Sequence, residues 1–211
     1  MRFVCTSDTH GMHDRRAIPP GDVFLFAGDM LGGLDFEGVR SFAEFLSALP
    51  HRHKVVIAGN HDFPFERRPE EARAALSGCC AYLQDSEVAI EGVRVYGSPW
   101  QPWFFDWAFN LERGERIRGK WDLIPEGIDI LLTHGPAAGH GDAVDRGKNA
   151  GQRVGCADLL DALRRVRPKV HVFGHIHEGY GETREGDIRC LNVSMCDVEY
   201  RPVNDPVVFD Y

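Results

Sequence analysis

Short apolar runs recur along the 211-residue chain, and helical stretches separate several of them. Residues 22–27 (DVFLFA) carry no polar side chain after the first, which is typical of a strand buried on both faces of a sheet. Residues 36–49 and 157–166 place apolar side chains at helical spacing. This alternation of buried strands and amphipathic helices predicts an α/β fold.

The remaining elements are expected to form two sheets. Further strands are expected at residues 2–6, 54–58, 128–133 and 170–173, with a short helix at 69–76. Residues 87–96 have the pattern of a hairpin that turns at Glu91-Gly92, which indicates a second, partly antiparallel sheet. Residues 188–193 and 207–209 are expected to finish that second sheet. Because no repeat, linker or low-complexity stretch interrupts the pattern, a single domain over residues 1–211 is expected.

Composition and charge disfavour several classes of partner. No segment approaches the run of roughly 18 apolar residues that a bilayer crossing needs, so no membrane partner is expected. The net charge of −8 repels polyanions and disfavours a nucleic acid polymer. The six cysteines show no C-x-x-C spacing and suggest no disulfide framework. No secretory signal is visible, so a cytoplasmic location is expected; the oligomeric state stays open.

Polar residues with metal-ligand chemistry follow five of the apolar runs. They are Asp8, His10, Asp29, Asn60, His61, His134, His175 and His177. Each lies just past the carboxyl end of an expected strand, the edge at which open α/β sheets bind ligands. Carboxylate, amide and imidazole donors without thiolate suit divalent ions such as Mn, Fe or Zn. One such motif alone is a common turn or cap, but five in order predict one metal site.

These motifs resemble, in order, those of the calcineurin-like metallophosphoesterases. The matching segments are Asp8-Thr9-His10, Gly28-Asp29, Gly59-Asn60-His61-Asp62, Thr133-His134-Gly135 and Gly174-His175-Ile176-His177. Residues 96–102, 107–110 and 133–136 further resemble the MPPED-type branch, whose members are phosphodiesterases. The resemblance implies a four-layer α-β-β-α sandwich of two mixed sheets, with a two-metal site at the sheet edge.

The resemblance also implies two ligand sets. One ion would be bound by Asp8, His10, Asp29 and His177. The other would be bound by Asp29, Asn60, His134 and His175, so that Asp29 bridges the two. Mn is the favoured metal, with Fe or Zn as alternatives. Two ions about 3.5 to 4 Å apart can share a carboxylate and a hydroxide, which lowers the pKa of the water and aims it at phosphorus.

His61 matches the family's phosphate-contacting histidine and is a candidate general acid for the departing alkoxide. Asp62 would orient the imidazole of His61. The alternative for His61 is a packing role beside Phe63 and Phe65.

The continuation after Asp29 bears on the substrate. Many phosphatases of the superfamily carry an Asp-Arg pair there, whereas this chain continues Met30-Leu31-Gly32-Gly33. Since arginine forks suit the doubly charged head of a monoester, a less cationic pocket favours a singly charged diester. The sequence therefore predicts hydrolysis of phosphodiesters in small nucleotide-type substrates. The alternatives are a nuclease, a phosphomonoesterase, or a catalytically slow scaffold that binds metal or nucleotide.

Residues 98–110 form an aromatic-rich segment without periodicity, expected to be a loop. Trp100 and Trp103 could form a wall on which a nucleobase stacks; alternatively, this loop only covers the second sheet. Farther along, Arg146 or Lys148 could meet a phosphate, although a solvated loop is the simpler interpretation.

Overall fold

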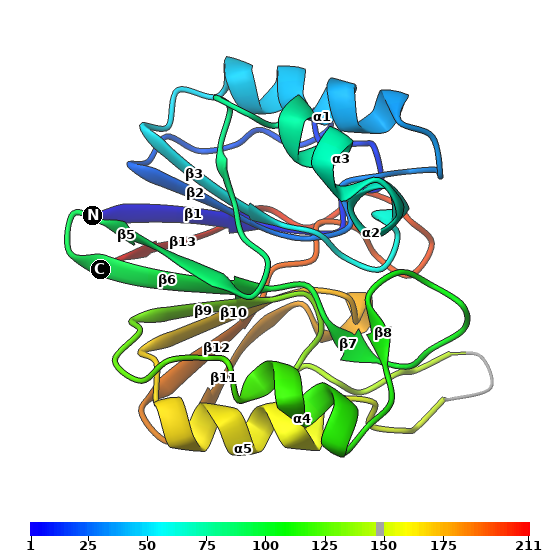
Figure 1. Cartoon of the computed structure of the whole chain (residues 1–211), viewed down its shortest axis with the longest axis vertical. Coiled ribbons are helices and arrows are strands. Elements are labelled where there is room, and N and C mark those ends of the chain that lie inside the picture. Colours follow the sequence, from blue (N-terminus) through cyan, green and yellow to red (C-terminus); the bar gives the residue numbers. More distant parts are fainter. Residues whose placement is uncertain (147–149) are drawn as a thin grey trace.

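The computed structural model describes residues 1–146 and 150–211. Two sheets pack face to face, and helices cover the outer face of each (Figure 1). This is the expected four-layer α-β-β-α sandwich. None of the helices in these ranges has the length and apolarity that a bilayer crossing requires.

The first sheet has the order β13-β1-β2-β3-β4. Its strands are β1 (Arg2–Thr6), β2 (Val23–Ala27), β3 (His53–Ile57), β4 (Ala81–Tyr82) and β13 (Val207–Asp210). Strands β1 to β4 pair in parallel, and β13 runs antiparallel to β1.

The position of β13 corrects the expectation that residues 207–209 finish the second sheet. Its register pairs Phe209 with Phe3, and the two rings stack with centroids 5.1 Å apart. Both side chains lie in the core between the sheets. A short apolar strand carries no local signal that selects its partner, so this pairing depends on where the chain returns.

The second sheet has the order β11-β12-β10-β9-β6-β5. Its strands are β5 (Ser86–Ile90), β6 (Val93–Ser98), β9 (Ile130–Thr133), β10 (Val170–Phe173), β11 (Gly181–Glu185) and β12 (Ile188–Asn192). The predicted hairpin is β5–β6, and Glu91 and Gly92 both have positive φ, of 48° and 90°, as its tight turn requires. The expected loop contains one short parallel pair, β7 (Gln101–Pro102) and β8 (Asn110–Leu111).

Helices α1 (Glu37–Ala48), α2 (Phe63–Arg67) and α3 (Pro69–Ala75) lie on the first sheet, and α4 (Glu115–Trp121) and α5 (Ala157–Val166) on the second (Figure 1). Periodicity predicted α1 and α5, and the proline at its first turn predicted α3. Periodicity missed α2 and α4, which have five and seven residues and are too short to show a pattern.

Strand β2 shows why its sequence has no polar interruption. Leu25 points into the core between the sheets, whereas Phe24 and Phe26 point to the core beneath α1. All five residues of β2 are buried because both faces of the sheet are covered.

Candidate metal centre

The candidate site lies where parallel strands of both sheets end. Strands β1, β2 and β3 of the first sheet, and β9 and β10 of the second, run toward the side of the molecule that carries β7 and β8 (Figure 1). The loops that follow these strands carry the predicted ligands. The two sheets therefore contribute to one centre.

The members of the first predicted ligand set lie close together. His10 Nε2 is 3.3 Å from His177 Nε2, and His177 Nε2 is 3.5 Å from Asp8 Oδ1. Asp29 Oδ2 lies 4.0 Å from His10 Nε2. The potential ligand atoms of Asp8, His10 and His177 all lie within 4.8 Å of one another, a spacing that one ion can span.

The second predicted set gathers on the other side of Asp29. His134 Nε2 lies 2.7 Å from Asn60 Oδ1 and 3.5 Å from Asp29 Oδ2. The ring of His175 is 5.0 Å from that of His134. Asp29 is 2% exposed and lies between His10 of the first set and His134 of the second, the place that a bridging carboxylate needs.

Two histidines show that this donor set fits divalent cations. The Nδ1–H of His134 donates to the carbonyl of Ala27 at 2.9 Å, and that of His177 to the carbonyl of Asp197 at 2.8 Å. Each Nε2 therefore aims its lone pair at the centre, where for His134 the nearest atom is the carbonyl oxygen of Asn60. A lone pair that faces an oxygen is unfavourable unless a cation or a proton lies between them.

In the metal-free protein a proton takes that place. Burial disfavours the charged form of His134, but the adjacent Asp29 carboxylate outweighs it and raises the pKa of His134 to about 9. Burial opposes charge on His177 as well, and the carboxylate of Asp8 raises its pKa to about 9. The site thus attracts positive charge strongly.

The ligand loops hold an unusual backbone conformation. Asp8, His10, Asp29 and His175 have φ values of 51°, 46°, 57° and 69°, in the left-handed region that costs a non-glycine residue about 1 to 2 kcal/mol. Strain of this kind persists only where the surrounding structure enforces it, and it gathers at functional sites. A Cβ on Gly174 would overlap the Asp8 carboxylate, so glycine is required for the loops to meet.

The carboxylate of Asp8 is fixed by partners that the motifs did not reveal. The hydroxyl of Ser194 donates to Asp8 Oδ2 at 2.9 Å, the Ser7 hydroxyl donates to the same oxygen, and the backbone N–H of His175 donates at 3.0 Å. Ser7 precedes Asp8 in sequence, but Ser194 follows β12, and no sequence signal connects it to the site.

His61 stands at the opening of the centre. Its side chain is 27% exposed, and its Nε2 lies 4.0 Å from Asp29 Oδ2. Its ring contacts those of Trp107 and His10, at 4.6 and 4.8 Å between centroids. Among the aromatic contacts of the described residues, none joins His61 to Phe63 or Phe65, so the packing alternative is not what the geometry favours.

The carboxylate of Asp62 has other partners than the expected imidazole. It accepts hydrogen bonds from four backbone N–H groups, those of Gly59, Asp29, Met30 and Leu31, at 2.7 to 3.4 Å. No hydrogen bond to the His61 ring occurs among the described residues. Asp62 therefore ties the loop after β2 to the loop after β3, and with them two ligand segments.

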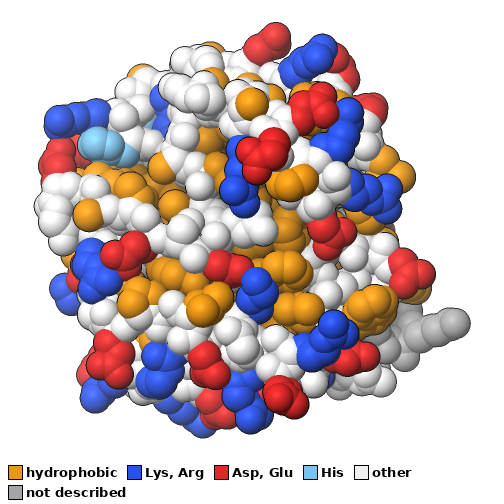
Figure 2. Space-filling model, viewed as in Figure 1, with side chains coloured by type: hydrophobic (Ala, Val, Ile, Leu, Met, Phe, Trp, Pro, Cys, Tyr) orange, Lys and Arg blue, Asp and Glu red, His pale blue; other side chains and the backbone are white. Residues whose placement is uncertain are grey.

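An apolar cavity of about 670 Å³ adjoins the centre. His175 is one of its lining residues, together with Trp103, Phe104 and Arg146. Hydrophobic side chains gather on the same side of the molecule, around the position of β7 and β8 (Figure 2). Trp103 and Arg146 thus border the same space, whereas Lys148 lies outside the described residues.

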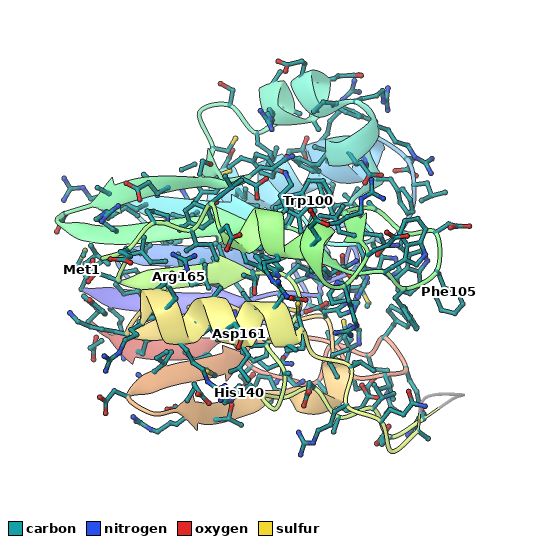
Figure 3. All side chains as sticks on the ribbon, turned by 60° about the horizontal axis from the view of Figure 1, so that its bottom comes forward. Met1, Trp100, Phe105, His140, Asp161 and Arg165 are labelled. Carbon is teal, nitrogen blue, oxygen red and sulfur yellow. The ribbon has the colours of Figure 1, made fainter. Side chains whose placement is uncertain are left out.

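Trp100 differs from the sequence expectation. Its indole N–H donates to Asp85 at 2.9 Å, Lys120 lies over its ring, and its side chain packs against Phe109. In Figure 3, Trp100 lies inward near α4, whereas Phe105 stands at the outer edge. Trp100 is not among the residues that line the cavity, because its ring fills the space between the helix and the sheets.

Tyr200 was missed entirely by the sequence analysis. Its ring lies 4.7 Å from that of His10 and 5.6 Å from that of His177, and its own φ is 58°. It follows β12, far from every motif, and only the fold brings it to the rim of the centre.

The chain is similar in sequence to a known protein family and to several known proteins. The family model described as calcineurin-like phosphoesterase matches residues 1–179. "Metallophosphoesterase domain-containing protein 1" of Homo sapiens is 48% identical, over 99% of this chain and 70% of its own length. A UPF0046 protein of Caenorhabditis elegans is 44% identical, over 100% of this chain and 60% of its own.

Among solved structures, a phosphopantetheinyl hydrolase from Mycobacterium tuberculosis aligns with a TM-score of 0.68. The alignment covers 97% of this chain and 95% of that one, at 14% identity. At this identity the likeness shows a shared fold.

Proposed function

The chain belongs to the calcineurin-like phosphoesterase family, and on that premise we propose that it hydrolyses phosphodiester bonds in small nucleotide-type substrates with two divalent metal ions. The observation that carries this proposal is that two sets of histidine and carboxylate side chains meet at Asp29. The Nε2 atoms of His134 and His177 are aimed at the centre of these sets.

Each group of side chains would have a defined task. One ion would be held by Asp8, His10, Asp29 and His177, and the other by Asp29, Asn60, His134 and His175. When bound, the pair would supply Lewis-acid stabilisation of the phosphoryl oxygens and an activated water, with Mn favoured over Fe or Zn. His61 would hold a proton at the opening of the centre and give it to the departing alkoxide.

The preference for a diester rests on how few cationic side chains the described residues place beside the centre. Met30 and Leu31, which follow the bridging Asp29, are fully buried and apolar. Two arginines border the cavity: the guanidinium of Arg146 donates to Glu199 at 3.0 Å, and that of Arg113 donates to the backbone carbonyls of Val154 and Gly155. A monoester carries up to two negative charges and gains most from an unpaired guanidinium fork, whereas a diester carries one.

The nucleotide-type substrate is supported by Trp103. Trp103 is 56% exposed beside the cavity, so its indole is accessible to a flat group. Stacking of a base on an aromatic ring contributes about 1 to 3 kcal/mol.

Hydrolysis of two model esters tests the proposal. Chelator-stripped protein is reloaded with Mn²⁺, its metal content is measured, and turnover of bis-p-nitrophenyl phosphate is compared with that of p-nitrophenyl phosphate. Activity restored by metal and favouring the diester is expected. A monoester preference would make the protein a phosphomonoesterase. No turnover of either ester by protein that has bound metal would refute the proposed enzyme activity. The protein would then be a scaffold that binds metal or nucleotide.

A further inference from the structure

The cavity beside the metal centre contains few groups that could read a ligand by hydrogen bonds. Its side chains are apolar apart from His175, which belongs to the centre, the indole N–H of Trp103 and two arginines. Among the described lining residues there is no Ser, Thr, Asn, Gln, Asp or Glu.

Both arginines direct hydrogen bonds to other parts of the protein. The guanidinium of Arg113 donates to the carbonyls of Val154 and Gly155. That of Arg146 donates to Glu199. Most of the surface left for a ligand is apolar and is made by side chains such as those of Phe104, Val144 and Ile176.

The aromatic loop at the cavity wall is held in place while it exposes its rings. The side-chain amide of Asn110 donates to the carbonyls of Phe104 and Phe105, at 3.2 and 2.9 Å. Trp103 and Phe105 are nevertheless 56% and 65% exposed. Large apolar side chains fixed in a solvent-exposed position mark a surface that binds an apolar group.

This loop also contacts the candidate general acid. The ring of Phe104 lies 5.4 Å from that of Trp107, and Trp107 lies 4.6 Å from His61. His61 itself does not line the cavity, whereas His175 does. If the leaving oxygen faces His61, the ester group that stays on phosphorus is directed to the His175 side, into the cavity.

We propose that this cavity binds the retained ester group of the phosphodiester and selects it by apolar contact area, not by hydrogen bonds to a base edge. The preferred substrates are diesters in which this group is large and flat, aryl or nucleoside, with little discrimination among the bases. The inference rests on the proposed phosphodiesterase function.

A substrate series with a constant leaving group tests it. Metal-loaded protein is given p-nitrophenyl esters whose second ester group is methyl, phenyl, or the 5′-linked nucleoside of adenine, guanine, cytosine or uracil. The kcat/KM of the phenyl ester is expected to exceed that of the methyl ester at least tenfold, and the nucleoside esters to fall within about threefold of one another. Equal rates for methyl and phenyl esters, or a tenfold preference for one base, would overturn the inference.

Matched variants locate the effect. Trp103→Ser is expected to lower kcat/KM for the phenyl ester about tenfold and for the methyl ester less than twofold. Leu123→Ser removes a side chain of a residue that is similarly exposed, at 54%, but lies two residues after α4 and outside the cavity lining. It is expected to change the kcat/KM of neither ester. An equal loss on both esters in Trp103→Ser would contradict binding of the ester group there.

A binding measurement separates this inference from the proposed function. Calorimetry compares methyl phenylphosphonate with methyl methylphosphonate, neither of which carries a p-nitrophenyl leaving group. At least tenfold tighter binding of the phenyl compound, lost in Trp103→Ser, is expected. Tighter binding of the phenyl compound without turnover of any diester would refute the proposed enzyme activity but support the proposed role of the cavity. Turnover of diesters with equal binding of the two phosphonates would support the enzyme activity and refute the role of the cavity.

Discussion

Replacing Asp62 tests whether this carboxylate holds the ligand loops or orients the His61 ring. Its Oδ2 accepts the N–H groups of Gly59, Asp29 and Met30 at 2.7, 2.9 and 3.4 Å, and its Oδ1 that of Leu31 at 3.1 Å. All of these groups lie where water cannot replace the acceptor, since Asp62 is fully buried.

The two substitutions should differ in a defined way. Asp62→Ala leaves four buried amides without an acceptor, at about 1 kcal/mol or more each, so a loss of about 4 kcal/mol is expected. Asp62→Asn keeps one oxygen at the Oδ2 position and strands only the amide of Leu31, which costs about 1 to 3 kcal/mol. Burial and the charge of Asp29 raise the pKa of Asp62 to about 7, so its buried carboxylate is itself unfavourable. Both substitutions remove this carboxylate, and the loss in free energy of unfolding should therefore lie at the low end of each range.

Urea unfolding of chelator-treated protein, followed by circular dichroism, measures these free energies. Asp35→Asn is the control, because Asp35 is exposed and accepts a single backbone N–H, that of Gly38, at 3.1 Å. It should change the free energy of unfolding by less than about 0.5 kcal/mol. Metal affinity should fall about 10- to 100-fold in Asp62→Ala, since the loops that carry Asp29 and Asn60 lose their tie, and less in Asp62→Asn, which keeps the Oδ2 bonds.

Wild-type stability in both Asp62 variants, together with loss of turnover, would refute this reasoning. The carboxylate would then act on the imidazole of His61, as the sequence analysis expected.

Three other outcomes follow from the site. Asp29→Ala should abolish binding of both ions and all activity, because one carboxylate serves both ligand sets; calorimetry that still showed two ions would contradict the bridge. His61→Ala should retain metal, by elemental analysis, yet lose turnover about 10²- to 10⁴-fold, and full activity would remove its role as general acid. His134 and His177, with pKa values near 9, each hold a proton at pH 7 that an ion must displace, so binding should release about two protons and strengthen as pH rises toward 9. Calorimetry in buffers of different ionisation enthalpy measures this release, and a value near zero would exclude it.

The sequence was sufficient for the elements whose signal is local. Residues 157–166 and 170–173 were predicted with the bounds that α5 and β10 have, because an apolar stripe or run shows in a short window. The ligand motifs were equally readable. Parallel strands of one sheet end at a common edge, so polar residues placed just after them are expected to lie together. That the ligand edges of two different sheets meet was decided by how the sheets pack.

Tertiary structure decided whatever depends on contacts between distant segments. Phe209 could have ended either sheet, and it pairs with Phe3 because the chain returns beside β1. Asp62 was adjacent to His61 in sequence, yet its carboxylate turns to backbone amides from the loop after β2.

The same reason separates the two tryptophans and conceals the remaining site residues. Trp100 and Trp103 are three positions apart in one aromatic segment, but only packing shows that Trp100 faces Asp85 and that Trp103 faces the cavity. Ser194 and Tyr200 reach the centre from beyond β12, and nothing in their neighbours predicts it. Short-range periodicity determines where helices and strands begin and end. The partner of a buried polar group or aromatic ring is determined only when distant segments of the chain pack together.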